Sequence, residues 1–148
     1  RPPSGGDTDL LKATAAGQCN IALANTYYLG RMKNSESDQI RKAAENLEVF
    51  WPNQGENDRG AHVNVSGAGI TKYAKNIESG IALLEYLVKD ESQRWYAEVN
   101  NEYPVVNGVM MSDTLRGFGN FKADTLNLSK LGEMNGEAVK LMDRSGWK

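Results

Sequence analysis

Four short runs in the first half of the chain carry the apolar or alternating pattern that is typical of β-strands. They are residues 19–24, 47–51, 62–65 and 70–73. Strict alternation predicts a half-buried strand, and a short continuous apolar run predicts a buried one. Pro52 ends the second run, because proline cannot donate to the hydrogen-bond ladder of a sheet. The pattern therefore predicts a set of short strands.

Helical spacing and helix-capping residues mark the remaining elements. The strongest pattern follows Asn76, where apolar side chains recur every three or four residues. A long last helix is predicted from Ser129 to Arg144, and Gly17 is suited to end the first helix. The residues predicted to cap helix N-termini are Asp7, Thr26, Ser37, Asn76, Asp90 and Ser112. Strands interspersed with a larger number of helices predict an α/β fold that is rich in helix.

Composition narrows the classes of function. The 148 residues are 40% hydrophobic and 24% charged, with a net charge of −2, which is ordinary globular composition. No cluster of basic residues indicates a nucleic-acid partner, and no apolar stretch approaches the roughly 20 residues needed to span a bilayer. The single cysteine, Cys19, excludes an internal disulfide and a four-cysteine zinc site.

The motifs of common enzymes are missing from the sequence. His62 is the only histidine, and no nucleophile elbow lies near it. The small-residue run 66–69 lacks the lysine and the strand–helix context of a phosphate-binding loop. Asp58 and Arg59 are expected to form a loop salt bridge or a hinge contact. An enzyme is therefore not supported.

Two adjacent tyrosines, Tyr27 and Tyr28, lie where the first apolar run meets a predicted helix start. Ligands of α/β folds bind beyond the strand ends, and two phenolates facing one point suit a hard trivalent cation, whose charge lowers the pKa of a bound oxygen acid. The alternative is purely structural, with one tyrosine packed in the core and the other capping the helix.

A longer resemblance includes this tyrosine pair. Residues 22–30, Ala-Leu-Ala-Asn-Thr-Tyr-Tyr-Leu-Gly, resemble the tyrosine-pair segment of bacterial periplasmic ferric-iron-binding proteins, the solute-binding components of iron ABC transporters. Further similar segments follow in the family's order, at residues 17–20, 50–54, 59–69, 102–105 and 121–125. The resemblance covers essentially the whole chain and matches the C-terminal portion of that family.

The resemblance implies a fragment of a two-lobed type-II periplasmic binding protein, which closes on Fe³⁺ and delivers it to an inner-membrane ABC transporter permease. Tyr27 and Tyr28 then correspond to the family's iron ligands, and Asn25 to a position that helps hold an accompanying anion. His62 corresponds to no ligand. A binding protein of the same fold for a small organic anion is the alternative.

The same resemblance predicts how the chain is divided. Residues 1–58 are expected to form part of the C-terminal lobe, residues 59–110 to cross to the N-terminal lobe, and residues 111–148 to return. The chain begins Arg1-Pro2-Pro3 without an initiator methionine or signal peptide, so we expect it to be part of a longer protein. With most of one lobe missing, the apolar face of Ile81, Leu84 and Val88 would lack cover, and the fragment would self-associate.

Overall fold

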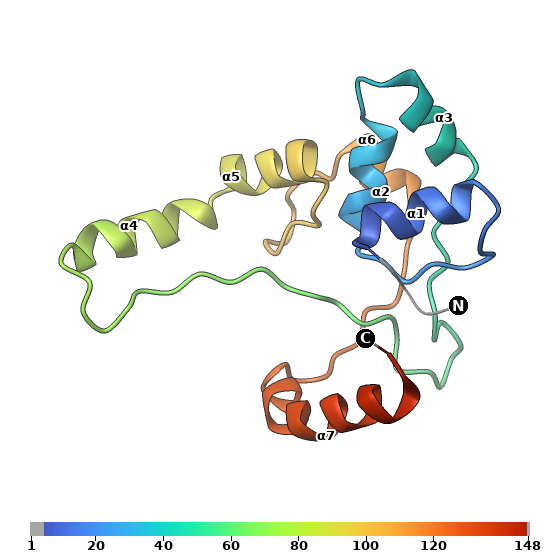
Figure 1. Ribbon diagram of the computed structural model, residues 1–148. Coiled ribbons are helices and arrows are strands. Elements are labelled where there is room, and N and C mark those ends of the chain that lie inside the picture. Colours follow the sequence, from blue (N-terminus) through green and yellow to red (C-terminus); the bar gives the residue numbers. More distant parts are fainter. Residues whose placement is uncertain (1–4, 148) are drawn as a thin grey trace. The chain divides into compact units, whose positions relative to one another are not determined.

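The structure is a computed structural model that describes residues 5–147, and its regular elements are helices (Figure 1). Between Tyr96 and Asn100 the chain forms a π-helix, η1, directly after α5. The α-helices are α1 (Asp7–Ala15), α2 (Thr26–Lys33), α3 (Asp38–Glu45), α4 (Ile77–Leu87), α5 (Asp90–Trp95), α6 (Asp113–Gly117) and α7 (Ser129–Ser145). None of these described helices is both long enough and apolar enough to cross a membrane.

The predicted strands are wrong for the part of the chain that the structure describes. None of the four runs forms a strand, and residues 72 and 73 lie in a turn; the one β contact within residues 5–147 is an isolated parallel bridge between Ala61 and Ala123. Ile21 is 88% exposed and Leu23 78%. An extended segment becomes a strand only when a second segment satisfies its N–H and C=O groups, and these runs find no such partner here. The expected richness in helix is confirmed, whereas the short strands of the predicted α/β fold are not formed among the described residues.

The helix boundaries follow the local signals closely. Ser37, Asn76 and Ser112 are confirmed as N-cap residues, and the Ser112 hydroxyl accepts a hydrogen bond from the Leu115 N–H. Gly17, at a φ of +76°, ends α1 as predicted. Other N-caps lie one residue earlier than expected, at Gly6, Asn25 and Lys89. At the first of these, the Asp9 carboxylate accepts from the Gly6 N–H and so supports the helix start.

The chain divides into two compact units, each assembled from separate segments. Unit 1 contains residues 1–24, 50–63 and 121–148, and unit 2 contains residues 25–49 and 64–120. Residues 1–4 and 148 lie outside the described part, and so does the expectation drawn from Arg1-Pro2-Pro3. The predicted lobe boundaries remain a prediction.

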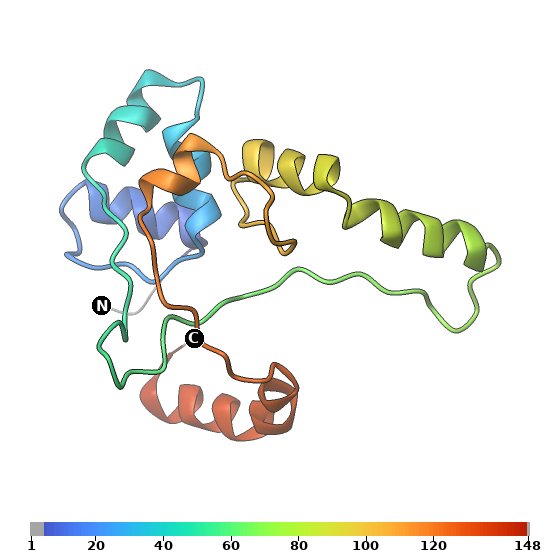
Figure 2. The ribbon, with the colours of Figure 1, turned by 180° about the vertical axis from the view of Figure 1, so that it is seen from behind.

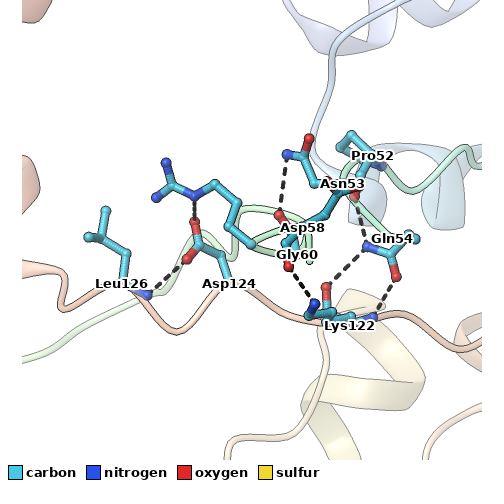
Figure 3. A network of polar contacts seen from close by, with 9 residues as sticks. Pro52, Asn53, Gln54, Asp58, Gly60, Lys122, Asp124 and Leu126 are labelled. Carbon is cyan, nitrogen blue, oxygen red and sulfur yellow. Dashed lines mark hydrogen bonds and ion pairs between the residues drawn. The ribbon is translucent and has the colours of Figure 1, made fainter. Parts of the chain in front are cut away.

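In unit 1 a polar network joins the loop 52–60 to residues 121–126 (Figure 3). The Gln54 side chain acts like a strand partner, because its Oε1 accepts from the Lys122 N–H at 2.7 Å while its Nε2 donates to the Lys122 carbonyl at 3.1 Å. The Lys122 ammonium donates to the carbonyls of Gly55, Glu56 and Asp58. Trp51 and Phe121 stack beside this network, with ring centroids 4.1 Å apart.

An ion pair completes this junction. Arg59 Nε donates to Asp124 Oδ2 at 2.7 Å, so Arg59 pairs across the junction, and the expected loop pair with Asp58 is replaced by a bond from the Gly55 N–H to Asp58. The other Asp124 oxygen accepts from the Leu126 N–H at 2.9 Å. The Leu126 hydrogen bond, and then Arg59 and His62, lower the pKa of Asp124.

In unit 2, α2 packs against α3, α6 and η1, and its neighbours α3 and α6 are visible from both sides (Figures 1 and 2). The buried apolar residues of this unit include Leu29, Met32, Ala44, Ala97 and Leu115. The unit's core therefore surrounds α2, the helix that contains the tyrosine pair in its first turn.

The remaining long helices, α4 and α7, bury little of their apolar surface. Neither α4 nor α7 contains a buried residue. On α4, Ile81 and Val88 are exposed, as expected, and Leu84 is half-buried. On α7, Met134 and Leu141 are exposed. Helices with uncovered apolar faces depend on further contacts for their stability.

Candidate metal site

The candidate site is built on the first turn of α2. Asn25 has extended backbone angles (φ −70°, ψ 138°) and is the N-cap, and Thr26 begins the helix. The Tyr28 N–H donates to the Asn25 carbonyl at 3.2 Å, which closes the first turn. The side chains of Tyr27 and Tyr28 therefore extend from the first turn of α2, so the pair lies at a helix start, as the sequence predicted.

The two tyrosine rings lie side by side. Their centroids are 4.4 Å apart and their planes are tilted by 36°. Both residues are half-buried, whereas Leu29 and Gly30, which follow them, are buried. Neither ring thus belongs to the fully buried core, and the pair is partly open to solvent.

Arg31 is the residue near this pair that sequence reasoning missed. Its guanidinium carbon lies 5.3 Å from the centre of the Tyr27 ring and 5.7 Å from that of Tyr28. Both distances are within the range of a cation–π contact. Its spacing of three and four residues from the tyrosines is visible in the sequence and puts all three on one side of a helix.

Asn25 contacts the second segment of unit 2. Its Oδ1 accepts a hydrogen bond from Asn64 Nδ2 at 3.2 Å. The carboxamide is thus engaged beside the start of α2, and residue 64 of the extended segment is held next to the tyrosine pair. The structure brings Asn25, Tyr27 and Tyr28 together on one helix start.

Other residue types offer no competing metal centre in the described part of the chain. Residues 5–147 contain no group of three or more histidine, cysteine, aspartate or glutamate side chains placed to hold an ion. His62 is exposed and belongs to unit 1. Burial raises the pKa of Tyr103 to about 12, so this phenol is harder to deprotonate and a poorer ligand than an ordinary tyrosine.

Relatives of known sequence match the whole chain. It is 45% identical over all 148 residues to iron uptake protein A2 of Synechocystis sp. and equally identical to iron uptake protein A1 of the same organism. No protein-family model matches the sequence.

Solved structures match it equally completely. A Trichodesmium protein (IdiA, FutA) in complex with iron and citrate is 51% identical, with a TM-score of 0.93 over 100% of this chain and 46% of its own. A ferric binding protein from Campylobacter jejuni is 36% identical, with a TM-score of 0.93 over the same share of each chain. The chain is homologous to ferric-iron-binding proteins. This confirms the resemblance seen in the sequence.

The match is partial on the side of the relatives. The chain spans 43% of iron uptake protein A2 and 41% of iron uptake protein A1. At a TM-score of 0.93 the backbone described here nevertheless agrees with the corresponding part of a ferric binding protein.

Proposed function

We propose that this chain carries part of a ferric-iron site, with Tyr27 and Tyr28 as metal ligands. The observation that supports it most directly is the pair of half-buried tyrosines, 4.4 Å apart at the start of α2, in a chain homologous to ferric binding proteins.

The chemistry of the pair suits this metal. Fe³⁺ is a hard, highly charged ion, and carboxylate-like or phenolate oxygen is the ligand type that such ions prefer over thiolate. Adjacent phenolates repel each other, so both ionise together only when the cation compensates their charge. Arg31 places a further positive charge beside the pair, and this charge also favours the phenolate form. Binding of iron to the two oxygens should therefore release protons.

An accompanying anion is the second part of the proposal. The related Trichodesmium structure contains citrate together with iron. Asn25 precedes the tyrosines and has a carboxamide, a group that can donate to an anionic oxygen. We assign Asn25 to the anion, with the Asn64 hydrogen bond orienting its amide.

The same comparison supports a proposal about the wider role of the protein. We propose a periplasmic, non-enzymatic binding protein whose two lobes close on Fe³⁺ and which delivers the metal to an inner-membrane ABC transporter permease. In this division, residues 1–58 and 111–148 belong to the lobe with the tyrosines, and residues 59–110 cross to the other lobe. Each lobe would supply ligands, so the complete site needs residues beyond this chain.

Substitution of the tyrosines tests the metal assignment. Ferric iron added to the full-length protein should produce a visible phenolate-to-iron charge-transfer band, and Tyr27→Phe with Tyr28→Phe should abolish or strongly shift it. The matched control is Tyr73→Phe, because Tyr73 is an 84% exposed tyrosine of the same unit. An unchanged spectrum in the double variant would exclude these two residues as ligands.

The alternative ligand is a small organic anion without iron, and the citrate of the related structure is the observation that favours it. Calorimetry with citrate alone separates the two functions. Binding of citrate only in the presence of Fe³⁺ supports the ferric site, and equal binding without iron supports the anion-binding protein.

A further inference from the structure

A buried asparagine at the end of the π-helix contacts the helix that carries the tyrosine pair. Asn101 is 2% exposed and adopts the left-handed conformation, with φ at +59° and ψ at 38°. A non-glycine residue seldom adopts this conformation, although asparagine tolerates it best. A short π-helix before such a residue is itself uncommon and often marks a functional region.

The contact between Asn101 and α2 is unusually close. A Cβ atom built on Gly30 would lie 2.5 Å from the Asn101 Cβ and 2.7 Å from its Cγ. These atoms are near the backbone and cannot swing away like the end of a long side chain. Position 30 therefore accepts only glycine as long as Asn101 and α2 keep their places.

Hydrogen bonds fix the same contact at the end of α2. Asn34, the C-cap of α2, donates from Nδ2 to Asn101 Oδ1 at 2.8 Å. Its own Oδ1 accepts from the Thr114 hydroxyl at 3.1 Å, which adds α6 to the network. The Asn101 carboxamide is thus held while its stem fills the space beside Gly30.

The geometry determines where the helix can sit. Tyr28 lies two residues before Gly30 on the same eight-residue helix. A shift or rotation of α2 at Gly30 and Asn34 is carried to its first turn, because a helix of two turns moves as a rigid body. The position of the phenol oxygens then depends on the contacts of Asn101 with Gly30 and Asn34.

We propose that Asn101 is a positioning residue for the iron site. It acts by fixing the position of α2 through its contacts with Gly30 and Asn34. This inference rests on the proposed function of Tyr27 and Tyr28. Residues that orient metal ligands without touching the metal change affinity by about 10- to 100-fold when they are substituted.

Two substitutions approach the contact from opposite sides. In the full-length protein, Gly30→Ala forces α2 away from η1, and Asn101→Gly keeps the left-handed backbone but removes the side chain. Each should shift the charge-transfer maximum and weaken Fe³⁺ binding by about tenfold or more. The double variant should recover part of the loss of Gly30→Ala, because the new methyl group enters the space that Asn101 occupied.

Asn53→Gly is the matched control, since Asn53 is the other described non-glycine residue with positive φ, at +56°, and it belongs to unit 1. It should leave spectrum and affinity unchanged. If Asn101→Gly does not fold, Asn34→Ala removes the amide partner alone and makes the same test. A purely structural role would lower the melting temperature while leaving the spectrum and affinity of the folded variants as in the wild type, and that result would overturn the inference.

Failure of the proposed function has a different signature, because the wild-type protein would then show no charge-transfer band at all. A wild-type band that Asn101→Gly and Gly30→Ala leave in place would refute only the positioning role.

Discussion

Among individual residues, the tyrosine pair makes the strongest prediction about pH. The phenol of tyrosine has an ordinary pKa of about 10. If both phenols are protonated in the free protein, loading releases two protons, and iron affinity should fall about hundredfold for each unit by which pH is lowered. Competition against a chelator of known pH dependence measures this slope in the full-length protein.

The same titration includes its own control. Tyr27→Phe removes one releasable proton, so its slope should fall to about half of the wild-type value. An affinity that does not change with pH would mean that neither phenol loses its proton on loading.

For Asp124 we expect a pH dependence of the stability of the fold rather than of iron binding. The Leu126 N–H, Arg59 and His62 lower its pKa in the folded protein, so the ionised carboxylate stabilises the fold above the unfolded pKa of about 3.9. This contribution is lost as pH falls through the folded pKa. Asp124→Asn should therefore lower the urea midpoint at pH 7, and the difference from wild type should shrink toward pH 3.

Asp113→Asn is the matched control for this comparison. Asp113 also pairs with an arginine, Arg116, but its side chain is 95% exposed, compared with 9% for Asp124. Exposed ion pairs contribute little, so Asp113→Asn should leave the midpoint nearly unchanged at both pH values. An equal effect of the two substitutions would contradict a special role for the junction.

Among the elements, the junction of unit 1 depends on a glycine. Gly60 has a φ of +95°, and an added Cβ would lie 2.6 Å from the Ala123 carbonyl carbon and from the Lys122 oxygen. Gly60→Ala should therefore destabilise the protein by about 1–3 kcal/mol or more, since the strained backbone and the clash act together. Urea denaturation of the full-length protein measures the loss.

Gly17→Ala separates the cost of the strained backbone from the cost of the clash. Gly17 also has a positive φ, +76°, but nothing lies within 4 Å of its added Cβ. This variant should lose about 1 kcal/mol, the backbone cost alone. If both variants were equally stable, close packing of Gly60 against residues 122 and 123 would not matter.

The elements also show what sequence could predict. The N-caps at Ser37, Asn76 and Ser112 were predicted because residue types that favour a helix start are a local signal in the sequence, although of these three only the Ser112 side chain accepts a hydrogen bond from the first turn. The strands were not predicted correctly. Alternation of apolar and polar residues favours an extended segment, but it does not identify the segment that would be its hydrogen-bond partner. Residues 19–24 form no strand and lack that partner among the described residues.

Of the candidate site, too, the sequence could predict one part and not another. Tyr27 and Tyr28 were placed correctly at a helix start because their neighbours in sequence define that start. The contact of Asn101 with Gly30 spans 71 residues of sequence, and no local pattern predicts it. Asn101 offered one signal, since asparagine is favoured where the backbone turns left-handed at a helix end.

For the molecule as a whole, uncovered apolar helices predict association. Exposed apolar residues on α4 and α7 include Leu83 and Leu141, and apolar patches of this kind promote contact between molecules. The 148-residue chain on its own should therefore form oligomers, and light scattering coupled to size exclusion would detect them. Leu83→Lys with Leu141→Lys should shift the distribution toward monomer.

The control for charge alone is Glu85→Gln with Glu137→Gln, which makes the same change of net charge on the same two helices without removing an apolar side chain. It should leave the oligomers in place. A stable monomer of 16.3 kDa that binds iron tightly would show that the chain needs no further cover and that its site is complete.

The division of unit 1 into three segments also sets an order in time. The Ala61–Ala123 bridge and the Arg59–Asp124 pair each join residues more than 60 positions apart. A ribosome adding about 5–20 residues per second needs several seconds to make that stretch. Throughout this interval the loop 52–60 has emerged without residues 122–124, and unit 2 likewise lacks Thr114, which donates a hydrogen bond to Asn34. The nascent chain therefore carries both units incomplete until residues 114–124 are made, and neither polar network can close before then.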